Sequence, residues 1–199
     1  MSLRFRAALT AERLRHRLLG VPLACPHDVD NDSRESPHDV RRVTVDGRPA
    51  LLCYGRPSVR GRRIFGELVP YGQLWRTGAN EPTTLHLPFA ADVAGLPLPR
   101  GRYALYSVPG ETDWVLVVNG STRQSGRTRE ERGRRGRLFP NAYTEAVARA
   151  EVGRRAVEST RVDHVEQLSI EAEPGAAGST TLLLSWEEVQ LRIPIRALR

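Results

Sequence analysis

The sequence predicts a mainly β domain, an antiparallel β-sandwich or barrel-like sheet with a short N-terminal helix. Two observations predict this fold. Short apolar runs of about five to seven residues recur along the chain. Turn signals such as Asp46-Gly47, Pro109-Gly110 and Asn119-Gly120 separate these runs. Strands punctuated in this way are typical of antiparallel sandwiches and barrels.

The length and composition fit one folded domain. The chain has 199 residues, of which 40% are hydrophobic, so it can bury a substantial core. We divide it into an extension over residues 1–35, made of a short helix and an acidic loop, and a single β domain over residues 36–199. No apolar run approaches the roughly 18 residues of a membrane helix, so no membrane span is expected.

The N-terminal extension begins with a helical pattern. Leu3, Ala7, Leu14 and Leu18 recur at helical spacing, and Gly20-Val21-Pro22 marks a turn. Charged residues interrupt the apolar stretch that an export signal requires. We therefore expect no working signal peptide, and a cytoplasmic location is slightly favoured.

Within the β domain, each expected strand is a short apolar run. Residues 143–157 are ambiguous, because their alanine, glutamate and arginine content favours a helix whereas their alternation allows a strand. Leu96–Pro99 with Gly101 is expected to form a turn. The expected strands are Val43–Val45, Ala50–Tyr54, Arg63–Phe65, Leu68–Val69, Thr83–Leu87, Tyr103–Val108, Trp114–Val118, Val165–Glu171, Thr180–Trp186 and Val189–Ile195.

Two cysteines, Cys25 and Cys53, are too few for a disulfide framework. They can form one bond in an oxidising compartment or stay reduced in the cytosol. Cys53 lies within the apolar run Ala50–Tyr54, which favours a buried, inert thiol at this position.

The basic residues are all arginines. The sequence has 30 Lys and Arg residues, none of them lysine, and a net charge of +7. A basic chain attracts acidic partners, but a GC-rich genome also produces arginine in place of lysine. The arginines are densest in the loop at 121–138, where no aromatic residues alternate with them. We therefore do not expect nucleic acid as a partner.

The candidate ligand site is a polar, glycine-rich stretch between Tyr54 and Thr84. Arginine offers a planar fork to a carboxylate or phosphate, and Gly78 with Asn80 indicates a tight turn that presents backbone N–H groups. Glu81 is a candidate acid or base. The structural alternative is a large loop held by Arg–Glu and Arg–carbonyl hydrogen bonds. The candidate ligand-binding residues are Tyr54, Arg56, Arg62, Trp75, Arg76, Asn80 and Glu81.

Histidines supply the other candidates for catalysis. A catalytic site assembled from His38, His86 and Glu81 is one alternative, although a lone strand histidine such as His86 is more often a packed side chain. The acidic loop 28–39 has carboxylates in the order of a calcium loop, but Ser33 stands where the turn requires glycine. No metal site and no cofactor are predicted.

Several longer motifs are distinctive. They are Tyr54–Arg62, Leu68–Gly72, Trp75–Glu81, Leu98–Gly110 (of the form Leu-Pro-x-Gly-x-Tyr-x-Leu-x-x-x-Pro-Gly), Trp114–Asn119 and Ser185–Glu187.

Together these motifs resemble the bacterial family known as domain of unknown function 2911, from about Ser36 to Ile195. The resemblance implies a compact, mostly β domain, with strand rather than helix at 143–157. It also implies that many relatives are exported, and it implies no established activity.

Three functions are compatible with these residues. We favour the binding of a small anionic or polar ligand by the candidate residues, converging at one end of the sheet. The second is a hydrolase- or lyase-like enzyme in which Glu81 or a histidine acts as base and Arg76 stabilises negative charge. The third is an interaction protein that binds an acidic partner through the loop at 121–138. The oligomeric state stays open.

Overall fold

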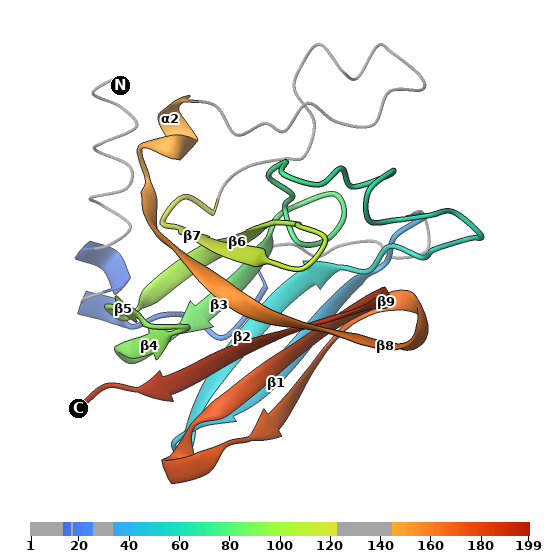
Figure 1. Cartoon of the computed structure of the whole chain (residues 1–199). Coiled ribbons are helices and arrows are strands. Elements are labelled where there is room, and N and C mark those ends of the chain that lie inside the picture. Colours follow the sequence, from blue (N-terminus) through green and yellow to red (C-terminus); the bar gives the residue numbers. More distant parts are fainter. Residues whose placement is uncertain (1–13, 17, 26–33, 123–144) are drawn as a thin grey trace.

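The computed structural model describes residues 14–16, 18–25, 34–122 and 145–199 (Figure 1). This part of the chain forms a nine-stranded antiparallel sheet in the order β1-β2-β3-β6-β7-β8-β9-β4-β5, which confirms the mainly β, antiparallel prediction. The elements are β1 (His38–Val45), β2 (Arg48–Gly55), β3 (Thr83–Leu87), β4 (Ala91–Val93), β5 (Leu96–Leu98), β6 (Gly101–Val108), β7 (Trp114–Asn119), the short helix α2 (Glu145–Ala148), β8 (Glu151–Pro174), the 3-10 turn η2 (Ala176–Gly178) and β9 (Thr180–Ala197).

The β1–β2 hairpin follows from its turn residues. Asp46 and Gly47 both have positive φ, at 50° and 71°, as a two-residue type I′ turn requires. Val45 pairs with Arg48, and in such a hairpin this closing pair is hydrogen-bonded and the pairs then alternate. The backbone N–H and C=O groups of Arg42 and Thr44 therefore point away from β2, toward the open edge of β1.

The sheet folds over on itself because β8 passes from one half to the other. Its first part pairs with β7, and from Glu158 onward it pairs with β9. The β8–β9 pairing shifts register on either side of Val165, and such bulges bend a strand. Figure 1 shows β8 and β9 lying across β1 and β2, so the arrangement resembles a sandwich made from one sheet.

The main core fills the space between the two halves. Leu52, Leu85 and Leu116 contribute from the first half, and Leu184 and Ile193 contribute from β9; all are 3% exposed or less. At one end the core becomes aromatic. Its rings are Phe65, Trp75, Trp114 and Trp186, with Trp75 stacked on Trp186 at 5.6 Å and the Phe65 ring edge-on to the three indoles.

Two expected strands, at 63–65 and 68–69, are wrong, and Leu96–Leu98, expected within a turn, forms the strand β5. Residues 63–69 form a turn-rich loop with a single isolated bridge, between Phe65 and Val69. The three short strands expected near the C-terminus are instead parts of β8 and β9, with 24 and 18 residues. Apolar runs predict only the buried stretches of such strands, because the middle of β8 is largely exposed at the bend.

The ambiguous segment contains both structures. Residues Glu145–Ala148 form the helix α2, closed by the bond from Arg149 N to Glu145 O (3.0 Å) and an ion pair between the same side chains. Pairing with β7 begins at Glu151. The expectation of a strand throughout 143–157 is therefore wrong at α2, where hydrogen bonds within the segment determine a helix. It is correct from Glu151, where pairing with β7 determines a strand.

The N-terminal helix is present in its described part, residues 14–16 and 18–19. The described members of its expected apolar stripe do not pack on the domain, since Leu14 is 54% and Leu18 is 73% exposed, whereas His16 is buried. Residues 26–33 of the acidic loop and 123–138 of the arginine-rich loop lie outside the described part, and so does the start of the helix.

Candidate functional site

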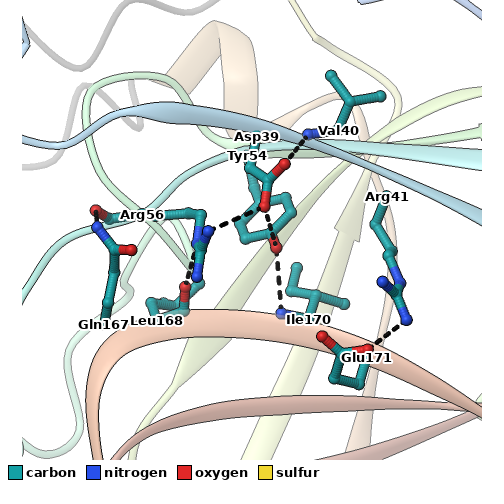
Figure 2. A network of polar contacts seen from close by, with 9 residues as sticks. All are labelled: Asp39, Val40, Arg41, Tyr54, Arg56, Gln167, Leu168, Ile170 and Glu171. Carbon is teal, nitrogen blue, oxygen red and sulfur yellow. Dashed lines mark hydrogen bonds and ion pairs between the residues drawn. The ribbon is translucent and has the colours of Figure 1, made fainter. Parts of the chain in front are cut away.

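A polar network joins the β1–β2 hairpin to β8 (Figure 2). Asp39 and Tyr54 are direct partners in the hairpin register, so their side chains share a face. The Tyr54 hydroxyl donates to Asp39 Oδ2 at 3.1 Å and accepts from Ile170 N at 3.3 Å. Arg56 donates from Nε to Leu168 O at 3.0 Å and places Nη1 3.3 Å from Asp39 Oδ2. The network therefore ties Tyr54 of β2, and Arg56 directly after β2, to the backbone of β8.

This part of β8 would otherwise be an unpaired edge. The short segment Pro57–Val59 covers the neighbouring residues, through Leu168 N to Pro57 O at 3.0 Å and Val59 N to Glu166 O at 2.7 Å. Buried backbone groups need such partners. Tyr54 and Arg56 therefore provide the backbone of β8 with hydrogen-bond partners that a neighbouring strand would otherwise provide.

Tyr54 stays a neutral hydroxyl in this environment. Burial raises the pKa of Tyr54 to about 12, and the Asp39 carboxylate acts in the same direction, against the Ile170 N–H and Arg56. A neutral phenol can both donate and accept, which is the role that the hydroxyl has here. It is not poised as a base at neutral pH.

The Trp75–Glu81 segment is tightly bonded to its own backbone. Trp75 Nε1 donates to Gly78 O at 3.1 Å, and the buried Arg76 donates from Nη1 to Asn80 O at 2.8 Å. Asn80 has a φ of 64°, as the predicted turn requires, and buried Thr77 also has a positive φ, of 56°. Glycine at position 78 allows the turn to pack closely on the end of β2, because a Cβ there would lie 3.1 Å from Gly55 O. The turn is thus a closely packed end to the core.

Glu81 is engaged by an arginine that precedes β1. Arg34 donates from Nη1 to Glu81 Oε2 and from Nη2 to Glu81 Oε1, both at 2.9 Å. Asn80 Nδ2 donates to Ser36 O at 3.2 Å. The Arg34–Ser36 segment is therefore held against the turn by a bidentate ion pair and an amide hydrogen bond.

The remaining predicted residues lie apart. Arg62 bonds within its own turn, to Val59 O at 2.9 Å and to Ser58 O at 2.6 Å. His38 begins β1 and pairs with Gly55. The structure thus brings Tyr54 and Arg56 together with Asp39, and Asn80 and Glu81 together with residues 34–36.

Sequence reasoning missed the role of Glu187. Its carboxylate accepts from Ile64 N at 2.9 Å and from Phe65 N at 3.1 Å, and its φ is 55°. It holds the loop at 63–69 against the aromatic end of the core. The signal was an acidic residue directly after a buried Trp186 in an apolar strand.

His86 and the cysteines form a separate cluster. Cys25 and Cys53 are joined in a disulfide, so the expectation of a buried thiol is wrong in its redox state, although Cys53 is indeed buried. His86 is also buried, with Nδ1 2.9 Å from Pro22 O and Nε2 3.7 Å from Cys53 Sγ. The bond forms because the outer face of β2 meets residues 21–25, a contact that no local pattern encodes.

A groove of about 480 Å³ opens between the β1–β2 turn and the β8–β9 hairpin. The two hairpins meet beside it through Asp46 N to Gly178 O at 2.8 Å and Thr180 Oγ1 to Thr44 O at 2.6 Å. Arg42 is exposed, and its guanidinium has no hydrogen-bond or ion-pair partner among the described residues. The lining residues are Arg41, Arg42, Val43, Thr44, Asp46, Gly47, Ala172, Glu173, Pro174, Gly175, Gly178, Ser179 and Thr180.

Two wider features of the site can be stated for the described residues. They contain no group of three or more His, Cys, Asp or Glu side chains arranged to hold a metal ion. None of the helices in that part is long and apolar enough to cross a membrane.

Comparison with known proteins gives one match. No curated protein and no solved structure matches the chain. The model of the family described as "Protein of unknown function (DUF2911)" matches residues 36–195, the whole sheet apart from the last two residues of β9. The match extends from the segment before β1 to the C-terminal strand, and with it the chain belongs to the DUF2911 family.

Proposed function

We propose that this chain is a binding protein for a small anionic or polar ligand, which it holds in the groove between β1 and the β8–β9 hairpin. The observation that carries the proposal is Arg42. Its guanidinium is without a partner in the described part of the chain, and its backbone N–H points to the open edge of β1. An anionic group at this edge would receive a guanidinium and backbone donors together.

The charges around the groove favour one position for the anionic group. Arg41 is paired with Glu171, and Glu173 is paired with Arg192. Asp46 at the turn repels a second anion there. The anionic group of the ligand therefore lies beside Arg42, away from the turn.

The size of the groove suits a small molecule. Its volume of about 480 Å³ falls within the roughly 300–1,000 Å³ of small-molecule pockets. Among the described residues that line it there is no histidine or cysteine. Ser179 Oγ donates to Ala176 O at 2.7 Å and Thr180 Oγ1 donates to Thr44 O at 2.6 Å, so these hydroxyls position the backbone. Binding fits this set of groups better than catalysis.

Glu81, the candidate base of an enzyme, is held in an ion pair. Both oxygens of Glu81 accept from Arg34, and an ion-paired carboxylate is a weaker proton acceptor than one in an apolar pocket. This favours binding over the hydrolase- or lyase-like alternative. The arginine-rich loop, on which the interaction alternative depends, lies almost wholly outside the described residues.

Thermal unfolding in the presence of anions tests the proposal. The probes are inorganic phosphate, citrate and adenosine monophosphate, each titrated at constant ionic strength. A probe at about 100 times its Kd stabilises by about 2.7 kcal/mol, which raises the Tm of a chain of this size by about 5–10 °C.

Two variants test whether a bound probe lies in the groove. We expect Arg42→Gln to abolish the shift, and Arg63→Gln to retain it, because Arg63 is also an exposed arginine and lies outside the groove. The proposal is wrong if none of the anions raises Tm, or if Arg42→Gln responds to them as the wild type does.

A further inference from the structure

The Cys25–Cys53 disulfide joins two very different environments. Cys53 lies on β2 between Leu52 and Tyr54, which face the main core. Alternation along a strand therefore directs Cys53 to the outer face, where it is 3% exposed. Cys25 is half-buried and lies on the segment 21–25, which crosses this face. Cys25 is thus partly accessible as a residue, and Cys53 is covered.

His86 lies directly beside the covered sulfur. Its Nε2 is 3.7 Å from Cys53 Sγ and 3.3 Å from Thr84 Oγ1. Its Nδ1 is 2.9 Å from Pro22 O. Because a carbonyl oxygen only accepts, the Nδ1 carries the proton, and in the neutral ring Nε2 is an acceptor facing the sulfur.

A second basic residue shares this face. Arg102 on β6 is the direct partner of His86 in the β3–β6 register, and direct partners lie on the same face of a sheet. When Nε2 also takes up a proton, the His86 imidazolium can donate to the leaving Cys53 sulfur, and a positive charge beside a sulfur favours its thiolate form. The covered sulfur is therefore a better leaving group than an ordinary buried cysteine.

We propose that the Cys25–Cys53 bond is a thiol–disulfide exchange site, in which an external dithiol attacks Cys25 and Cys53 leaves toward His86. The attacking thiolate forms a new bond to Cys25 Sγ, and the electron pair of the Cys25–Cys53 bond passes to Cys53 Sγ. The second thiol of the dithiol then displaces Cys25 Sγ. The protein gains two thiols, the dithiol becomes a disulfide, and the protons of the dithiol balance the two cysteines.

Opening the bond changes the surface of the domain. It releases residues 21–25 from β2, and with them the contact between Pro22 and His86. The outer-face residues Leu51, Cys53 and His86, each 3% exposed or less while the bond is closed, then become reachable. Disulfides persist in oxidising compartments and are rare in the cytosol, so the state of this surface depends on the redox potential around the protein.

The first experiment identifies the attacked sulfur in the unmodified chain. The oxidised protein is treated with glutathione, quenched with acid, and mapped by mass spectrometry of its peptides. We expect the mixed disulfide on Cys25. A mixed disulfide on Cys53, or a native protein that forms none while the denatured protein does, would overturn the proposal.

The second experiment tests the role of His86. Dithiothreitol reduces the wild type, His86→Gln and the control His164→Gln, and alkylation with N-ethylmaleimide counts the thiols over time. His164 is an exposed histidine on β8. Without His86 the Cys53 sulfur leaves less readily, so reduction of the bond should slow by about tenfold.

We expect this tenfold loss in His86→Gln and no change in His164→Gln. Equal rates in all three proteins would show that His86 only packs against the bond. The glutathione mapping stands even if His86→Gln does not fold, since it uses the wild-type chain.

Discussion

Replacing Glu187 should loosen the aromatic end of the core. Its carboxylate accepts two backbone N–H groups, from Ile64 and Phe65. Both residues are buried, at 0% and 4% exposed, so water cannot readily replace the lost acceptor. A hydrogen bond to a charged group contributes about 1.5–3 kcal/mol. Glu187→Gln keeps the volume but turns an amide donor toward one of the two N–H groups, so we expect a loss of about 3 kcal/mol.

The backbone of Glu187 gives this prediction a second, independent part. Its φ of 55° lies in the left-handed region, which costs a residue with a Cβ about 1 kcal/mol relative to glycine. Glu187→Ala loses both hydrogen bonds and keeps this cost, whereas Glu187→Gly loses the bonds and removes it. We therefore expect the glycine variant to be about 1 kcal/mol more stable than the alanine variant.

Urea unfolding at neutral pH measures both parts. Glu188→Gln is the matched control, because Glu188 is the next residue and forms an exposed ion pair with Arg161, which contributes only about 0–1 kcal/mol. The reasoning is refuted if Glu187→Gln and Glu188→Gln differ by less than about 0.5 kcal/mol. A glycine variant no more stable than the alanine variant would refute the backbone part alone.

Three further predictions concern other contacts. Tyr54→Phe should lower the free energy of unfolding by about 2 kcal/mol, because a buried donor and acceptor lose their partner. The pKa of Tyr54 is about 12 in the folded chain, against 10.0 ordinarily, so stability should be full below about pH 10 and fall toward pH 12. Unfolding measured on both sides of about pH 10 should show that fall reduced in Tyr54→Phe; an identical profile would contradict it. Glu81→Gln should cost about 1 kcal/mol, because its bidentate pair with Arg34 is about a quarter exposed, and an unchanged urea midpoint would show that the pair contributes nothing. Replacing Cys25 and Cys53 with serine removes a link across 28 residues and should cost about 3–4 kcal/mol; a variant as stable as the oxidised wild type would contradict the bond.

Local sequence patterns predicted the strands whose neighbours lie nearby. The Asp46-Gly47 turn fixes the β1–β2 hairpin by its backbone angles, and β3, β6 and β7 were predicted from apolar runs that the sheet buries on both faces. The turn at Asn80 was also predicted, since its positive φ is a property that asparagine tolerates. In these places one local preference agrees with the global fold.

Long-range contacts determine the features that local sequence patterns did not predict. The length of β8 depends on two different partners, β7 and β9, and its exposed middle carries no apolar signal. The acceptors of Ile64 and Phe65 lie more than 120 residues away on Glu187. The structural alternative expected Arg–Glu bonds within the stretch between Tyr54 and Thr84, but the arginine that pairs with Glu81 is Arg34, and this pair depends on how the segment before β1 docks.

The features of the candidate sites are likewise determined partly by local sequence and partly by long-range contacts. By itself the sequence determined a mainly β domain of the DUF2911 family, the Asp46-Gly47 hairpin and a segment rich in arginine and carboxylates, because propensity, alternation and turn chemistry act within a few residues. Only the tertiary structure decided which arginine is paired and which is not, and that Cys25 meets Cys53 beside His86. Ion pairs, the groove and the disulfide each join distant segments, and the folding of the sheet over itself brings those segments together.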